Sequence, residues 1–158
     1  VAEAVTFLST ITAMSVTVHA IAPPGRTREA YDPSTCSLIL SSAGSPAPVI
    51  VHELGHALEH QAATPAQIGL RQSFYAKRTL SEVAVPLVTV TGNTAYHPTE
   101  HTKVDQWLHP YIGKLYADVR ASEVVSMGLQ LLYSDPVLLA DDLEHLDFMY
   151  AFLRGTYE

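Results

Sequence analysis

The sequence has little of what marks several common classes of protein. Its 158 residues include one cysteine, Cys36, so an internal disulfide is excluded; the composition suits the cytoplasm or a delivered or secreted effector. Only 9 Lys and Arg stand against 16 Asp and Glu, and the net charge of −7 argues against nucleic acid as a partner. No apolar run of about 18 residues is present, so no membrane span is predicted. No signal-peptide pattern opens the chain, which begins with Val1 rather than Met, as a fragment of a larger protein would.

The composition nevertheless predicts a folded chain. Apolar residues make up 47% of the sequence and the mean hydropathy is +0.13, which argues against disorder. The length suits one domain spanning residues 1–158, with enough chain to bury a core. We find no internal repeat, and nothing in the composition indicates an oligomeric state.

Apolar periodicity and turn residues predict an α+β fold that is mostly helical, with a small sheet. A short apolar strand is expected just before the helix that starts near Pro46. A long loop is expected over 92–112. The predicted helices are 1–14, 46–61, 65–78, 116–133 and 136–154, and the predicted strands are 15–21, 37–42 and 82–91.

The most specific pattern is His52-Glu53-Leu54-Gly55-His56. A helix turns about 100° and rises about 1.5 Å per residue, so His52 and His56 project about 40° apart and about 6 Å along the axis. Both imidazoles can reach one divalent ion, with Glu53 beside them as a base for water. The flanking residues are apolar, which predicts a buried helix in which these polar groups need partners. Random placement would produce the pattern roughly 0.02 times in such a chain.

A catalytic zinc takes three protein ligands and leaves one position for water, so a third ligand is needed. The predicted helix 116–133 is mostly apolar, and Glu123 lies on its one polar seam. A carboxylate in such a setting needs a cation, so we predict Glu123 as the third ligand. Two imidazoles and one carboxylate suit zinc. The other members of the seam are Tyr116, Ser126 and Gln130.

Tyr116 lies seven residues before Glu123, two helical turns away on the same face. Its phenol can donate a hydrogen bond to the oxyanion of a substrate bound at the metal. The alternative is a core tyrosine with a satisfied hydroxyl, and Tyr111 is the second candidate donor.

Other assignments stay open for several residues. Glu123 can instead pair with Arg120 on a helix surface. His60 lies about 12 Å from His52 along the helix axis, too far to share its ion. Cys36 is interpreted as a buried small residue, with a ligand role as the lesser alternative. The rival carboxylate ligands lie in segments that look exposed or weakly structured: Glu82, Glu100, Asp105 and Asp118. Three histidines are interpreted as loop residues, which can also mark a lid over the site: His97, His101 and His109.

On these residues the chain resembles the zincin metallopeptidases of the gluzincin type, in which a helix-borne glutamate is the third zinc ligand. The motif layout is similar to that of catalytic domains of the anthrax lethal factor type, with His-Glu-Leu-Gly-His at 52–56 and Tyr-x₆-Glu formed by Tyr116 and Glu123. The likeness covers the motifs and the order of elements. The aspartate that often follows the ligand glutamate by four residues is replaced by Met127.

The resemblance implies a zinc metallopeptidase, and an endopeptidase rather than an exopeptidase. One Zn²⁺ would be held by His52, His56 and Glu123, with Glu53 as general base and Tyr116 at the oxyanion. Strand 37–42 would bind a peptide or protein substrate by adding it to the sheet edge.

Two other functions remain open: a catalytically silent zincin-fold binding or structural module, and a metal-dependent amidohydrolase acting on a small molecule. The intact Glu53 argues against the silent module, because a pure binder needs no base. A wide groove beside an exposed edge strand favours a peptide substrate, whereas a closed pocket favours a small molecule.

Overall fold

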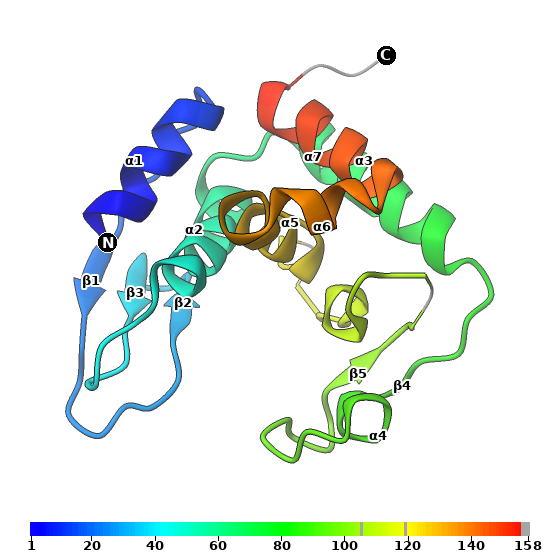
Figure 1. Cartoon of the computed structure of the whole chain (residues 1–158), viewed down its shortest axis with the longest axis horizontal. Helices are drawn as coiled ribbons and strands as arrows, with labels where there is room; N and C mark the ends of the chain where they lie inside the picture. Colours follow the sequence, from blue (N-terminus) through cyan, green and yellow to red (C-terminus); the bar gives the residue numbers. More distant parts are fainter. Residues whose placement is uncertain (105, 119, 156–158) are drawn as a thin grey trace.

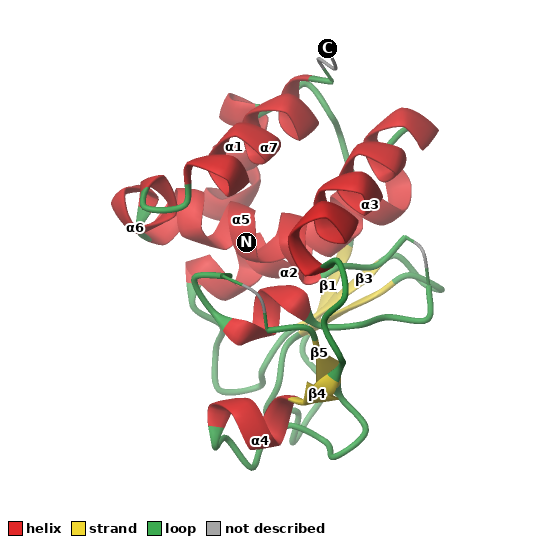
Figure 2. Cartoon of the chain, turned by 90° about the vertical axis from the view of Figure 1, so that its right-hand side faces the viewer, coloured by secondary structure: helices red, strands yellow, loops and turns green. Residues whose placement is uncertain are grey.

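The computed structural model describes residues 1–104, 106–118 and 120–155. Helices α1, α2, α3, α5, α6 and α7 gather in the upper part of the molecule, and the strands, most loops and the short helix α4 lie below them (Figure 1, Figure 2). This arrangement is mostly helical with a small sheet, as expected for an α+β chain. The helices are α1 (Ala2–Ile11), α2 (Ala47–Gln61), α3 (Pro65–Thr79), α4 (Leu87–Thr91), α5 (Glu123–Ser134), α6 (Pro136–Ala140) and α7 (Leu143–Arg154), with a 3₁₀ turn η1 (Pro110–Gly113). The strands are β1 (His19–Ile21), β2 (Ala30–Asp32), β3 (Ser37–Ile39), β4 (Val85–Pro86) and β5 (His101–Thr102).

Helix α2 runs through the centre of the molecule (Figure 1). It begins after Pro46, whose extended backbone and fixed φ suit a helix start, and Pro48 occupies the first turn, where its missing N–H is not needed. Its apolar residues are almost fully buried, which explains why so central a helix forms here. They are Ile50, Val51, Leu54, Ala57 and Leu58.

Helix α5 packs directly on α2. The two helices approach most closely where Gly55 meets Ser126, since a Cβ atom at position 55 would lie 2.6 Å from Ser126 Cα. Only glycine allows this contact. Val124, Val125 and Leu129 complete the interface from the α5 side and are fully buried.

Helices α3 and α7 pack against each other and against α5. A capping box formed by Thr64 and Gln67 starts α3, and Gln67 Nε2 also donates to Phe152 O at 2.7 Å. His145 of α7 is fully buried, and its Nε2 donates to Val124 O, in the first turn of α5, at 2.8 Å. The first turn of α5 is therefore fixed by contacts with other helices as well as by its own hydrogen bonds.

The small sheet has the order β1-β3-β2, with β3 parallel to β1 and antiparallel to β2. The prediction that strand 37–42 forms the sheet edge is therefore wrong: β3 is the central strand, and β2 forms an edge. The physical reason is burial, because Ser37 and Leu38 are buried and their strand is paired on both sides. Strand β2 was missed because three half-buried residues carry no readable alternation.

Three further predictions need correction. The predicted helix 116–133 starts only at Glu123, because Ser122 takes extended backbone angles (φ −155°, ψ 162°) at the N-cap, a position that serine favours. Tyr116 is therefore not helical. The predicted strand 82–91 is two residues of β4 followed by α4, since Pro86 starts a helix more readily than it continues a strand. The loop 92–112 contains β5 and the start of η1.

The remaining boundaries differ less. The first strand is limited to β1, and the last predicted helix is divided into α6 and α7. None of the described helices combines the length and the apolar character needed to cross a membrane.

Candidate metal centre and its cavity

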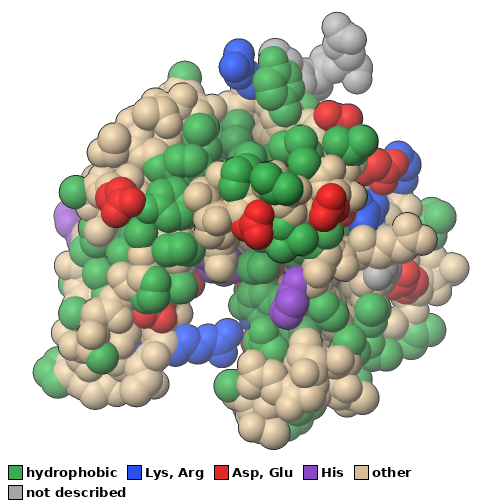
Figure 3. All heavy atoms as spheres, viewed as in Figure 1, with side chains coloured by type: hydrophobic (Ala, Val, Ile, Leu, Met, Phe, Trp, Pro, Cys, Tyr) green, Lys and Arg blue, Asp and Glu red, His purple; other side chains and the backbone are tan. Residues whose placement is uncertain are grey.

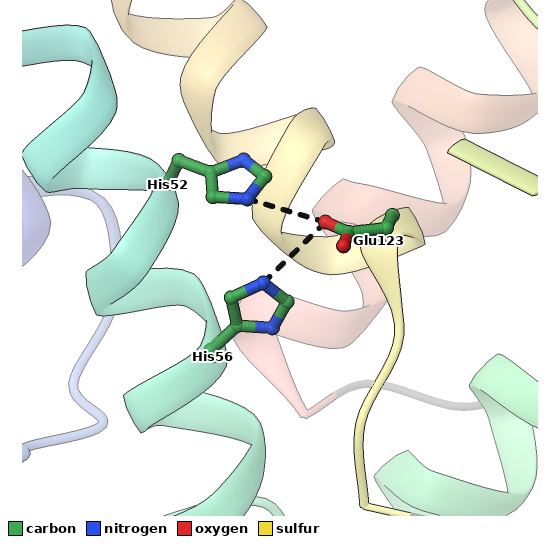
Figure 4. A group of neighbouring side chains, drawn as sticks. All are labelled: His52, His56 and Glu123. Carbon is green, nitrogen blue, oxygen red and sulfur yellow. Dashed lines mark ion pairs between the residues drawn. The ribbon is translucent and has the colours of Figure 1, made fainter. Parts of the chain in front are cut away.

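Three side chains that lie far apart in the sequence come together between α2 and α5. Atoms of His52, His56 and Glu123 that can bind a metal all lie within 4.8 Å of one another. Figure 4 shows the two imidazoles projecting from successive turns of α2 toward the carboxylate at the start of α5. The group can hold a metal ion.

The spacing within this group fits one small cation. The Nε2 atoms of His52 and His56 lie 3.2 Å and 3.4 Å from Glu123 Oε2. A tetrahedral ion with bonds of about 2.0–2.1 Å to its ligands places those ligands about 3.3 Å apart. The two histidine–glutamate separations therefore match the distance between two ligands of such an ion.

The electrostatics of the group also suit a cation. Glu123 is fully buried, and burial acts to raise the pKa of its carboxyl. The hydrogen-bonding contacts with His52 and His56 outweigh burial, so the pKa of Glu123 lies well below its usual value. The pKa of His56 is raised, since the interactions with Glu123 outweigh the effect of its own burial. A bound cation can take over this stabilisation of the carboxylate.

Three polar groups fix the orientation of Glu123. Ser126 Oγ, one turn along α5, donates to Glu123 Oε2 at 2.9 Å, and the Tyr116 hydroxyl donates to Oε1. Lys114 Nζ lies 3.9 Å from Oε1 and 2.7 Å from Glu100 Oε1. Because the carboxylate is held from several directions, it is positioned before any ion binds.

A second buried carboxylate anchors the start of α5. Glu59, one turn beyond His56, is 2% exposed and accepts a hydrogen bond from Ser122 Oγ at 2.9 Å. Arg71 Nε of α3 lies 3.0 Å from the same Glu59 oxygen. Burial raises the pKa of Glu59 to about 7 despite the positive charge of Arg71. Ser122 directly precedes Glu123, so this cluster fixes the backbone that carries the candidate ligand.

The support around the histidines is thinner. Within the described part of the chain, His52 Nδ1 is buried and has no hydrogen-bond partner. Metal-binding histidines usually donate that second N–H to a carboxylate or carbonyl. Met127, four residues after Glu123, lines the cavity and offers no carboxylate to these rings. The described surroundings therefore orient the carboxylate ligand more firmly than they orient His52.

The predicted base and both candidate phenols lie at this group. Glu53 is 8% exposed and lies close enough to influence the pKa of His56 and Tyr111. The Tyr111 ring stacks on the His52 ring with centroids 6.2 Å apart. Burial and the charge of Glu123 raise the pKa of Tyr111 and Tyr116, so both phenols stay protonated at neutral pH and can donate hydrogen bonds.

A cavity of about 810 Å³ opens onto these side chains. Its floor includes His52, Glu53 and His56, one side includes β2, and the facing wall carries Tyr111 and Tyr116. Figure 3 shows the molecule hollowed between its two lower lobes, with histidine colour at the inner end and a Lys or Arg side chain across the opening. The site is therefore an open cleft bordered by a strand edge.

Several alternative assignments from the sequence do not match the geometry. Arg120 Nη1 donates to His60 O at 3.3 Å, and the described contacts include no ion pair between Arg120 and Glu123. Cys36 is half-buried, takes a positive φ of 51° and lies outside the metal-binding group. Of the other predicted candidates, Glu100, Asp118 and His109 line the cavity, whereas Asp105 lies outside the described residues.

Tyr116 reaches Glu123 from a non-helical segment, so the helical argument for its position was wrong, and its role as oxyanion donor stays a prediction. The roles of Glu59 and Lys114 were not found from the sequence. The one available signal for Glu59 was its place within an apolar helix, where an acid needs a partner.

Comparison of the chain with protein-family models, with curated proteins and with solved structures finds no match.

Proposed function

We propose that the chain is a zinc-dependent peptidase with a zincin-like fold. The observation that carries this proposal is the convergence of Glu123 on the two imidazoles, with Glu53 beside them at the floor of an open cleft. Ligand separations of 3.2 Å and 3.4 Å suit tetrahedral zinc, and two imidazoles with one carboxylate leave a fourth position for water.

In the proposed reaction, zinc supplies the Lewis acidity that makes water a nucleophile near neutral pH. Glu53 accepts the proton of the attacking water and passes it to the nitrogen of the leaving amine as the peptide C–N bond breaks. The Tyr116 hydroxyl turns from Glu123 to the oxyanion of the tetrahedral intermediate, with Tyr111 as the second donor. The pKa of both phenols favours the protonated form that this role requires.

The cleft supports a peptide rather than a small molecule as substrate. Strand β2 forms an edge of the sheet and lines the cleft, so its outward backbone groups can pair with an extended peptide. This moves the proposed docking edge from strand 37–42 to β2.

The test is cleavage of a mixed peptide library by zinc-loaded protein. We expect cleavage by the wild type, and a Glu53→Gln variant that keeps its zinc but cleaves about 10²- to 10⁴-fold more slowly, the range for loss of a general base. Glu144→Gln is the matched control, because Glu144 is 55% exposed and pairs with Lys77 away from the cleft.

Two outcomes would contradict the proposal. A zinc-loaded wild type that leaves the whole library intact would favour the silent binding module. Equal cleavage by the wild type and Glu53→Gln would remove the proposed base.

A further inference from the structure

Some Lys and Arg side chains of this chain form ion pairs with Asp or Glu, and others do not. Three arginines line the cleft, Arg26, Arg28 and Arg120, and none forms an ion pair within 4.0 Å among the described residues. Four other cations are paired: Arg71 with Glu59, Lys77 with Glu144, Arg78 with Asp142 and, in the cleft, Lys114 with Glu100. The cleft lining therefore holds three guanidinium groups that no carboxylate of the described residues neutralises by direct pairing, although the lining also contains four Asp and Glu residues.

Arg28 lies toward the His52 end of the cleft. It precedes β2 by two residues and interacts across the opening with Tyr111, whose ring stacks on His52. The carboxylate that also attracts it, Glu100, is already bound by Lys114 Nζ at 2.7 Å. Arg28 therefore keeps hydrogen-bonding capacity for a ligand.

Arg120 lies toward the other end. Its Nη1 donates to His60 O at 3.3 Å, and Tyr31 of β2 contacts His60 Nδ1 at 3.3 Å. Besides Glu53 and Glu100, two carboxylates line the cleft: Asp118, whose Oδ1 already accepts the Arg120 backbone N–H at 2.8 Å, and Glu29. The guanidinium of Arg120 is thus tied by one hydrogen bond to a carbonyl, which leaves its other N–H groups for a ligand.

The candidate metal centre lies between these two arginines. His52 and His60 are eight residues apart on α2, about 12 Å along its axis. Tyr31 of β2 lies at the His60 end of this stretch, and Arg28 precedes β2 by two residues.

We propose that this cleft selects peptides that carry an acidic side chain on each side of the scissile bond, one bound by Arg28 and the other by Arg120. The inference deepens the proposed peptidase function and rests on it. The selection is local, because the net charge of −7 repels acidic peptides at longer range. Guanidinium groups suit this role, since they bind carboxylates with two parallel hydrogen bonds.

The experiment uses a peptide library with equal shares of Glu, Gln and Lys at every position, digested by zinc-loaded protein and sequenced. We expect Glu to be enriched on both sides of the cleavage site over Gln, and Gln over Lys. Arg28→Gln should weaken the preference on one side only, and Arg120→Gln on the other, by about fivefold in kcat/KM each, the upper end for an exposed ion pair. Arg154→Gln, an exposed arginine of α7 outside the cleft lining, is the charge-matched control.

Equal cleavage of Glu, Gln and Lys peptides, or an unchanged profile in both cleft variants, would overturn the inference while leaving the peptidase function intact. If no peptide is cut, binding of labelled Glu, Gln and Lys peptides to the zinc-loaded protein separates the two proposals. Arginine-dependent preference for the Glu peptide then supports the acidic ligand without catalysis, and no preference overturns it.

Discussion

The two sides of the cleft are built by different means. Helices α2 and α5 touch backbone to backbone at Gly55 and carry all three candidate ligands on regular structure. The wall that faces them is built from η1 and from loop segments on either side of it, and carries Tyr111, Lys114 and Tyr116. The candidate ligands are thus placed by regular helices, whereas the facing wall, which also contacts Glu123, is placed by short elements and loops.

The largest expected effect is on the helical side. Glu123→Ala removes the only acidic member of the metal-binding group. We expect zinc affinity to fall by more than about 100-fold, because loss of an outer partner alone costs up to that much. Competition with a chromophoric chelator measures the change. Glu144→Gln should bind zinc as the wild type does, and retention of wild-type affinity by Glu123→Ala would remove this residue as a ligand.

Substitutions in the facing wall should change the turnover rate rather than the binding of zinc. Tyr116→Phe removes the hydroxyl that now donates to Glu123. We expect kcat to fall by about 10²-fold, the lower range for loss of one oxyanion donor, with zinc content and KM nearly unchanged. Steady-state kinetics beside Tyr111→Phe assign the principal donor. A larger loss in Tyr111→Phe would transfer that role to Tyr111.

The close helix contact can be tested through stability. Gly55→Ala forces a Cβ to 2.6 Å from Ser126 Cα, so α2 and α5 must separate. We expect a loss of about 3 kcal/mol in the free energy of unfolding. Gly69→Ala in α3 is the matched control: no atom lies within 4 Å of its added Cβ, and alanine should stabilise the helix by up to about 1 kcal/mol. Urea unfolding of zinc-free protein measures both, and equal stability of the two variants would argue against the close approach.

The smallest expected effect is a change of protein stability with pH that arises from His145 of α7. Burial lowers the pKa of His145, which stays neutral in the folded protein while donating to Val124 O. Below about pH 6.5 the unfolded chain binds a proton that the folded chain does not, so His145 makes stability fall with decreasing pH by at most about 1.4 kcal/mol per pH unit.

His145→Gln keeps a donor and cannot titrate. The stability of the wild type relative to this variant should therefore decrease from pH 7 to pH 5. A difference that stays constant over this range would show that His145 is not held neutral.

The sequence predicted the arrangement of the side chains within one helix of the site, and little of the rest of the site. The spacing of His52 and His56 is read within one helix, so their common direction follows from helix geometry alone. Glu123 was found because a carboxylate among apolar residues needs a cation. The role of Glu59 was not predicted, because its partners Ser122 and Arg71 reach it only through tertiary contacts.

The sheet shows the same limit. Strands of three residues carry no readable period, so β2 was taken for a loop. The edge position of strand 37–42 was implied by the resemblance, and the structure makes β3 the central strand. Pairing order depends on contacts between segments distant in the chain, which local patterns do not encode. The position of the docking edge was therefore wrong although the existence of a small sheet was predicted.

The hydroxyl of Ser122 has a further consequence. A serine at this place in a helix normally accepts from backbone N–H groups of its own first turn, whereas here the hydroxyl donates to Glu59, which Arg71 also contacts. Helix α3, which contributes no residue to the cleft lining, is in this way mechanically linked to the rotation of Glu123. Substitutions on that outlying helix thus offer a remote means of adjusting the candidate metal centre without changing the residues that line the cleft.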